Sequence, residues 1–368
     1  MRIAYIVEPR KIIGGGVRAA MNLAKSLNRE SDIRCVIFGT YKNSVVDEQI
    51  KFVQVNTLNP IGVAYWRAFH KFVKNHNPDI VHCLGLYTAL GCLLYRKFKR
   101  RHFKIVCTVH RVTMNMRYRT LMKRVVGYIA KNVDYTTFLT NYQQEHYFSN
   151  VGFCPKRYEI IPNVIFVSHV SEHERVNLHK NLCDELNVET IISYVGRIIP
   201  SKNLEDFIRI IGILHKRGLR VGGLLVGGYE QSYFEILEKV VKEYGIDNKI
   251  KFLGYTNTPN LFTAASDYTT TTTTHGEALP NLLVESFALG KITFSSDIPQ
   301  MQGLISNGQN GFTLSLSSLE KFADKIEYII NHPNERAKIE QNAQTTYQEE
   351  YAPNVVTKKY LDIYSSLK

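Results

Sequence analysis

Two cations stand close together after a strand-like run. In the stretch SYVGRIIPSKNLEDFIRII, Arg197 and Lys202 follow an apolar segment and precede a helix expected around Leu204 to Leu214. Backbone amides at a helix N-terminus and two positive side chains at the carboxyl end of a strand suit a diphosphate. An Arg and a Lys in a loop are also typical of plain surface charge, so position alone leaves both interpretations open.

A glycine-rich loop, Gly14 to Gly16, follows the first strand pattern and precedes a helix. Glycines let the backbone approach a phosphate closely, and the free amides of a helix N-terminus supply donors. The loop also matches GxGxxA loosely, but the next strand pattern ends in Gly39 and Thr40, without the carboxylate that a dinucleotide ribose requires. It therefore predicts a phosphate site, or a tight turn without a ligand, rather than an NAD site.

Two carboxylates lie in the segment HGEALPNLLVESFALGK. Glu277 is expected in a loop, and Glu285 in a helix that Pro280 helps to start. Carboxylates so placed could accept hydrogen bonds from vicinal hydroxyls of a ligand. Glutamates are common on helices, so the bare pattern is weak.

Short apolar strand patterns alternate with amphipathic helices, which predicts an α/β protein with parallel sheets covered by helices on both faces. Because the pattern starts over near residue 190, we expect two doubly wound, Rossmann-like domains with a cleft between them. The expected limits are 1–165 and 190–347, with a polar, His-rich linker at 166–189 and a last helix at 348–368. The expected strands are Arg2–Val7, Arg34–Phe38, Ile80–Cys83, Ile105–Val109, Thr136–Leu139, Tyr158–Ile161, Ile191–Val195, Gly222–Val226, Ile250–Leu253, Tyr268–Thr273 and Ile292–Ser295.

Composition excludes several classes of protein. The 368 residues are 44% hydrophobic, enough for a buried core, and no apolar run approaches the ~20 residues of a membrane span. The start, MRIAYIVEPR, lacks the pattern of a signal peptide, so we expect a cytoplasmic protein. The six cysteines form no CxxC pair and predict reduced thiols rather than a zinc site or a disulfide framework.

The positive charge is concentrated in one segment. The net charge is +13, and twelve Lys or Arg residues without any Asp or Glu lie between Arg96 and Lys131. Leu121, Val125 and Ile129 recur there at helical spacing, which predicts a basic amphipathic helix. Its apolar face could join the core of its own domain, and its basic face could attach the protein peripherally to an anionic membrane. No nucleic-acid-binding motif accompanies the charge, so we expect no nucleic-acid partner.

The order of these elements is more specific than any one of them. The glycine-rich loop, His110 after the fourth strand, VGR with a lysine five residues past the arginine, VGG at Val226–Gly228, and E-x7-E follow in sequence. Together with IIPNV at Ile160–Val164 and NGQNGFTL at Asn307–Leu314, this order resembles the retaining glycosyltransferases of family 4, which have the GT-B fold. The resemblance spans about residues 3 to 312.

The resemblance implies a role for each candidate. Arg197 and Lys202 would bind the donor diphosphate and stabilise the charge that grows on it, while Gly15 and Gly16 would approach the same phosphates from the first domain. Glu277 would hold donor sugar hydroxyls, and Glu285 the nucleotide ribose. His110 would face the transferred sugar, although it could also simply cap its strand. The backbone near Leu279, Pro280 and Asn281 would complete the donor site; Ala278, Leu279 and Pro280 stand where many members of the family have Gly-Phe-Gly.

The resemblance also implies a mechanism and a substrate class. The acceptor hydroxyl would attack the face that the diphosphate leaves, and a donor phosphate oxygen would take the proton. Two cations would replace a metal, so we expect no cofactor and no divalent ion. The resemblance thus implies a metal-independent retaining hexosyltransferase that uses a nucleotide sugar and builds a lipid-linked or cell-surface glycan. A GT-B nucleotide-sugar epimerase, or a non-catalytic basic adaptor for membranes or nucleic acid, remain alternatives.

Overall fold

A computed structural model describes residues 1–8, 15–29, 32–40, 50–55, 57, 59, 62–110, 119–274 and 278–368. The chain divides into two compact units, and each is described on its own. The first comprises Met1–Phe166, the C-terminal Tyr351–Lys368 and a short segment that includes Leu279, and the second comprises Val167–Gly276 and Pro280–Glu350.

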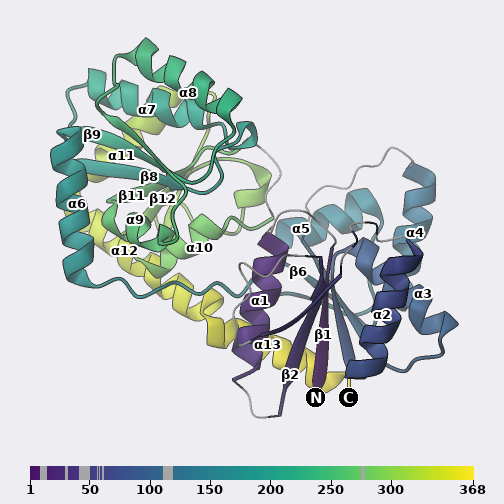
Figure 1. Ribbon diagram of the computed structural model, residues 1–368. Helices are drawn as coiled ribbons and strands as arrows, with labels where there is room; N and C mark the ends of the chain where they lie inside the picture. The colour runs from purple at the N-terminus through teal and green to yellow at the C-terminus, as the bar shows by residue number, and fades with distance from the viewer. Residues whose placement is uncertain are drawn as a thin grey trace. The chain divides into compact units, whose positions relative to one another are not determined.

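The described part of the first unit is built on a parallel sheet of seven strands, in the order β3-β2-β1-β4-β5-β6-β7. Helices α1 (Gly15–Leu27) and α13 (Pro353–Ser366) cover one face, and α2 (Val63–His76), α3 (Leu86–Phe98) and α4 (Arg119–Asn132) cover the other (Figure 1). After β6 follow α5 (Asn141–His146) and a π-helical turn, Tyr147–Val151. The strands are β1 (Arg2–Val7), β2 (Arg34–Gly39), β3 (Lys51–Gln54), β4 (Ile80–Leu84), β5 (Lys104–Val109), β6 (Tyr135–Phe138) and β7 (Tyr158–Ile160).

The second unit repeats this plan with six parallel strands in its described part, in the order β10-β9-β8-β11-β12-β13. Helices α7 (Leu204–Lys216), α8 (Gln231–Tyr244) and α11 (Leu319–Ile330) lie together on one face. The other face carries α6 (Glu172–Leu186), α9 (Pro259–Ala265), α10 (Asn281–Ala288) and α12 (Pro333–Thr346). The strands are β8 (Thr190–Val195), β9 (Val221–Val226), β10 (Ile250–Gly254), β11 (Tyr268–Thr271), β12 (Ile292–Ser296) and β13 (Gly311–Leu314).

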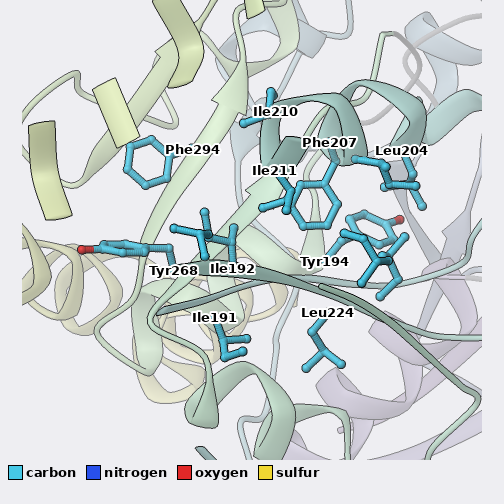
Figure 2. Packing of buried hydrophobic residues seen from close by; sticks show 14 of the residues in the cluster. Ile191, Ile192, Tyr194, Leu204, Phe207, Ile210, Ile211, Leu224, Tyr268 and Phe294 are labelled. Carbon is cyan, nitrogen blue, oxygen red and sulfur yellow. The ribbon is translucent and has the colours of Figure 1, made fainter. Parts of the chain in front are cut away.

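The core of the second unit explains why its strands read as unbroken apolar runs. Ile192 and Tyr194 of β8 lie under Phe207 and its neighbours on α7, whereas Ile191 points to the opposite face with Leu224 of β9 (Figure 2). Because helices cover both faces, the side chains of a central strand are buried whichever face they point to. The alternation of apolar and polar residues that marks a one-sided sheet is therefore absent. The α/β fold class predicted from the sequence is confirmed.

The segment expected as a linker, 166–189, is instead largely a helix of the second unit. Helix α6 begins with a capping box, in which the Ser171 side chain and Glu174 each bond the other's backbone amide. Leu182 and Leu186 are buried in the core of this unit. The prediction was wrong because a polar composition hid two helix signals: the S-x-x-E cap, and leucines four residues apart, beginning at Leu178.

The last helix, α13, packs within the first unit and ties its sheet together. The Tyr364 hydroxyl lies 3.0 Å from the Tyr5 hydroxyl and 2.7 Å from His82 Nδ1, while His82 Nε2 lies 2.6 Å from the Thr108 hydroxyl. Burial lowers the pKa of His82 to about 3, so the imidazole is neutral and bonds both hydroxyls without a charge. Helix α13 is therefore part of the core of this unit, although it is distant in sequence.

The structure bears on the expected state of the cysteines and on the expected lack of a membrane span. All six cysteines are free thiols, and Cys35, Cys83, Cys92 and Cys107 are buried. Of the helices that the structure describes, none is long and apolar enough to cross a membrane.

Candidate functional site

Arg197 and Lys202 lie at the carboxyl edge of the second sheet, the edge formed by the carboxyl ends of its strands. This edge has its switch point at β8, because the chain runs from β8 to β9 on one side and returns to β11 on the other. Ligands of doubly wound sheets bind where the strand order reverses in this way. Arg197 is exposed, whereas Lys202, at the end of a 3-10 turn over Pro200–Lys202, is only 9% exposed.

Close backbone contacts fix the loop that carries Arg197. The Gly196 amide donates to the Val226 carbonyl at 2.8 Å, and the Ile198 amide donates to the Gly228 carbonyl at 2.9 Å. The Tyr194 hydroxyl donates to the carbonyl of Arg197 at 3.0 Å. The VGR and VGG segments of the sequence therefore lie side by side, and the backbone beneath the guanidinium is held on both sides.

Replacing Gly227 with alanine is expected to destabilise this edge severely. Gly227 has a φ of +144°, and a Cβ there would lie 1.8 Å from the carbonyl oxygen of Gly196. The clash is with backbone, so we expect a loss of at least ~2 kcal/mol in the free energy of unfolding, measured by urea denaturation. Gly228→Ala is the matched control, because a Cβ there meets nothing within 4 Å. Equal stability of the two variants would contradict the packing described.

The backbone at Lys202 is fixed by a run of six threonines, Thr269 to Thr274. The Thr272 hydroxyl donates to the Lys202 carbonyl at 3.1 Å, and the Thr273 hydroxyl donates to the Ser201 carbonyl at 2.9 Å. Asn203 then adopts a left-handed φ of 49° and leads into α7, with its side chain donating to Asp206 at 2.7 Å. Lys202 is thus positioned by β8, β11 and α7 together.

Other threonine hydroxyls of this run form hydrogen bonds with neighbouring elements of the second unit. Thr269 lies 2.9 Å from the Ser286 hydroxyl and 2.8 Å from the Thr293 hydroxyl, and Thr271 lies 2.9 Å from the Ser295 hydroxyl. Threonine combines a β-branched shape with a donor and an acceptor that are satisfied between neighbouring elements. The expected strand over Tyr268–Thr273 is shorter, ending at Thr271, because the last two threonines bond the Ser201–Lys202 turn instead.

Burial and a neighbouring charge act on Lys202 in the same direction. Desolvation is the larger cause and the positive charge of Arg197 the smaller, and together they lower the pKa of Lys202 to about 8. The folded chain therefore holds two like charges close together, one of them out of water. Such a pair is stabilised when an anion binds between the charges, which fits a diphosphate site.

Helix α10 supplies the remaining candidates of this edge. Pro280 is its N-cap, with extended backbone, and Asn281 is its first residue, so the first-turn amides are free of helical partners. Leu279 is buried, and Glu285 is half-buried one turn further along the helix. Glu277 lies outside the described residues. Because β11 leads into this segment beside β8, Asn281 and Glu285 belong to the same edge as Lys202.

In the first unit, Gly15 and Gly16 begin α1, directly at the carboxyl edge of that sheet. His110 follows β5 at the same edge, and a Cβ on Gly16 would lie 3.6 Å from its ring. The structure therefore brings the glycine turn and His110 together. His110 Nε2 is buried and has no hydrogen-bond partner among the described residues.

His110 is expected to remain neutral throughout the physiological range. Burial lowers its pKa to about 4, from an ordinary value near 6.5. We expect its imidazole resonances to show no titration between pH 5 and 8 in a histidine-labelled NMR series, with His110→Gln identifying the signal. A midpoint near pH 6.5 for that signal would contradict the burial of the ring.

No group of three His, Cys, Asp or Glu side chains suited to a metal ion is present in the part of the chain that the structure describes. Because residues 275–277 and other segments lie outside that part, metal independence stays a prediction.

Comparison with known families decides the relationship. The model for glycosyl transferases group 1 matches residues 184–346, and the model for Glycosyltransferase Family 4 matches residues 13–168. The chain belongs to glycosyltransferase family 4.

Curated relatives and solved structures agree with the family. The chain is 25% identical over 206 residues to the capsular polysaccharide biosynthesis glycosyltransferase CapM of Staphylococcus aureus, covering 53% of this chain and 52% of CapM. It is 24% identical over 179 residues to the lipopolysaccharide core biosynthesis glycosyltransferase LpsE of Rhizobium meliloti, covering 48% of this chain and 50% of LpsE. The chain thus spans about half the length of these two relatives.

The structure of Anabaena HepE in complex with UDP matches all of both chains, with a TM-score of 0.85 and 18% identity. The outer core galactosyltransferase WaaB also matches all of both chains, with a TM-score of 0.72 and 18% identity. At these identities the likeness shows the fold, which is the GT-B fold of the family.

Within this family-4 chain, the residues that hold the predicted site were not singled out from the sequence. Tyr194 and the Gly196–Gly227 contact fix Arg197, and Thr272 and Thr273 fix the turn before α7. The threonine run was the available signal, because buried threonine hydroxyls in and after a strand need hydrogen-bond partners. Nothing in the sequence pattern indicated that Lys202 would be buried.

Proposed function

We propose that this family-4 protein transfers a sugar from a nucleotide-diphosphate sugar to a hydroxyl acceptor, with retention of configuration and without a metal ion. The observation that carries the proposal is the pair of Arg197 and Lys202 at the carboxyl edge of the second sheet, beside the start of α10. A cationic pair held rigidly at a switch point suits a diphosphate whose negative charge grows as its bond to the sugar breaks.

The proposed reaction breaks the bond between the sugar C1 and the diphosphate oxygen, and forms a bond between C1 and the acceptor oxygen on the same face. The acceptor proton passes to a phosphate oxygen, and the nucleoside diphosphate leaves. Arg197 and Lys202 stabilise that leaving group, Gly15 and Gly16 allow close approach of backbone, and Glu277 and Glu285 accept hydrogen bonds from hydroxyls. His110, neutral at its pKa of about 4, contributes a hydrogen bond to the sugar rather than a charge.

The substrate class follows from the relatives. Their names describe capsular polysaccharide and lipopolysaccharide core biosynthesis, and HepE was solved with UDP-glucose. We therefore infer a cell-surface or lipid-linked glycan as the acceptor, and we place UDP-sugars first among the donors.

The test is incubation with UDP-, GDP- and ADP-sugars in the presence of EDTA, following release of the nucleotide and the anomeric configuration of the product by NMR. We expect release with at least one donor, unaffected by EDTA, and an α-linked product from an α-linked donor. A requirement for Mg²⁺ or Mn²⁺ would refute the metal-free mechanism. A product that is an epimer of the donor, without a new glycoside, would identify an epimerase instead.

Exposed apolar side chains between the cations of the first unit support attachment to an anionic membrane. Val126, Ile129 and Ala130 of α4 are buried in the core of the first unit, so Ile129 of the expected apolar face is buried and Val125 packs against the core. Leu121, however, is 62% exposed, and Phe98 on the neighbouring α3 is 78% exposed. Each nearby cation adds about 1 kcal/mol of attraction to an anionic surface. We therefore place the protein in the cytoplasm, on the inner face of the membrane.

Reversing the charges of Lys123 and Arg124 is expected to abolish sedimentation with vesicles that contain phosphatidylglycerol. Both side chains are exposed on α4, and the double variant Lys123→Glu/Arg124→Glu changes the surface charge by four units. The matched control is Lys239→Glu/Lys242→Glu on α8, which makes the same change on the second unit. Binding of the wild type should weaken at high salt. If the wild type does not bind the vesicles, or if the α4 and α8 variants bind them equally well, α4 is an ordinary surface helix.

A further inference from the structure

A cavity of about 180 Å³ opens in the first unit between β1, α2 and α3, and none of the residues assigned above lines it. This volume is far above the ~15 Å³ that one water molecule needs. Most of its lining is apolar and aromatic. The side chains that define it come from three elements: Tyr65, Trp66 and Phe69 of α2, Tyr87 and Thr88 of α3, and Glu8 after β1.

The aromatic wall is built around Trp66. A Cβ on Gly91 of α3 would lie 2.5 Å from Cη2 of the indole, so the glycine lets the ring lie against that helix. The ring stacks on Tyr95 with centroids 6.5 Å apart, and it meets Phe69 edge-on at 5.5 Å. These contacts hold the indole rigidly, and Tyr87, 56% exposed, stands at the mouth. A rigid aromatic surface that is partly open to solvent favours a ligand with a flat apolar face.

A carboxylate lies beside this wall. Gly85 precedes α3 with a φ of +130°, and a Cβ there would lie 2.8 Å from Glu8 Oε1. The Thr88 hydroxyl donates to the Gly85 carbonyl at 2.8 Å, which fixes the turn. The carboxylate thus sits at the N-terminal end of a helix, where a negative charge is favoured. It offers acceptor oxygens to hydroxyl groups and repels anions.

The cavity also lies at the switch point of the first sheet. The chain runs from β1 to β2 on one side and returns to β4 on the other, and the cavity is lined from the ends of β1 and α3. It therefore shares the carboxyl edge with Gly16 and His110. Doubly wound sheets place their ligands at this point.

We infer that this cavity binds a neutral pyranose ring of the acceptor, an inference that rests on the proposed transferase function. The C–H face of a pyranose packs on Trp66 and Tyr87, and its hydroxyls donate to Glu8. An isoprenoid chain would use the aromatic wall but has no group for the carboxylate, and a phosphorylated group would be repelled by it. The cations at the carboxyl edge of the second sheet bind the donor, which leaves the acceptor to this unit.

The single tryptophan of the chain makes a direct test possible, because Trp66 is the only one. Labelling with 5-fluorotryptophan gives one ¹⁹F resonance, at the wall of the cavity. Methyl glycosides of glucose, galactose and N-acetylglucosamine are titrated to 50 mM without donor, with geraniol as the apolar probe, in the range of weak binding near ~1 mM and above. We expect a saturable shift with at least one glycoside. No shift with any glycoside, or a shift with geraniol alone, would overturn the inference.

Variants separate this cavity from general effects. Glu8→Gln keeps the shape but removes the charge, and Tyr87→Ala removes part of the wall; each should weaken glycoside binding at least ten-fold. Phe98→Ala is the control, because this aromatic side chain is exposed on the same helix and does not line the cavity. Glycoside binding that is unchanged in Glu8→Gln and Tyr87→Ala would place the sugar elsewhere.

Calorimetry with UDP, GDP and ADP on the same samples distinguishes the two proposals. Binding of one of these nucleotides without any glycoside would support the transferase proposal and contradict the acceptor cavity. Binding of a glycoside at Trp66 without any nucleotide would contradict the transferase proposal and support a saccharide-binding site alone.

Discussion

Replacing Arg197 with alanine is expected to lower kcat/KM for sugar transfer on the order of 10²-fold or more. The guanidinium would meet the charge that develops on the leaving diphosphate, and removing one preorganised donor from such a site costs about this much. Arg197 is exposed at the carboxyl edge of the second sheet, where solvent and a ligand can reach its guanidinium. The measurement is steady-state release of the nucleotide with the preferred donor.

Controls make the result specific to the site. Arg197→Lys should recover only part of the activity, because an ammonium keeps the charge but lacks the two-pronged geometry of a guanidinium. Arg220→Ala, which removes an exposed arginine at the opposite edge of the same sheet, should leave kcat/KM unchanged. Arg197 is exposed, so its removal should change the free energy of unfolding by less than ~0.5 kcal/mol. Turnover at the wild-type rate in Arg197→Ala would remove this residue from the mechanism.

The central strands of both sheets were predictable because burial on two faces leaves a composition signal. All eleven expected strands exist, most with ends shifted by only one residue, as at Ile105–Val109, where β5 begins at Lys104. The two strands that were missed, β3 and β13, are the outermost strands of their sheets. The side chains of β3 are half-buried or exposed over only four residues, so the sequence KFVQ gives no apolar run to detect.

The residue types of the candidate site were predictable from the sequence, but the burial of Lys202 was not. Arg197 and Lys202 were recognisable because they follow a strand and precede a helix, which topology alone brings to the carboxyl edge. The turn that carries Lys202 is held by Thr272 and Thr273, which follow β11 and are distant from it in sequence. The cavity at Trp66 is built from three separate elements, and no spacing along the chain could indicate it.

Replacing Lys202 with methionine is expected to have two opposite effects: loss of activity on the order of 10²-fold or more, and a gain in stability at pH 7. The activity falls for the reason given for Arg197. The stability rises because the ammonium is buried beside a second cation, which lowers its pKa from 10.5 to about 8. A charge buried at this cost contributes a destabilisation on the order of 3 kcal/mol, and methionine of similar length removes it. Lys239→Met, at an exposed position of α8, should do neither.

The dependence on pH gives each effect a sign. Between pH 8 and 10.5 the unfolded chain keeps the Lys202 proton that the folded chain has lost, so the stability of the wild type rises with pH across this window. The advantage of Lys202→Met should therefore be largest below pH 8 and vanish near pH 10.5, in urea denaturation at a series of pH values. Nucleotide affinity should move in the opposite direction and fall above pH 8, since only the charged amine attracts a diphosphate. An affinity that stays constant to pH 9.5, or a methionine variant less stable than the wild type at pH 7, would show that Lys202 is not a buried cation kept for an anionic ligand.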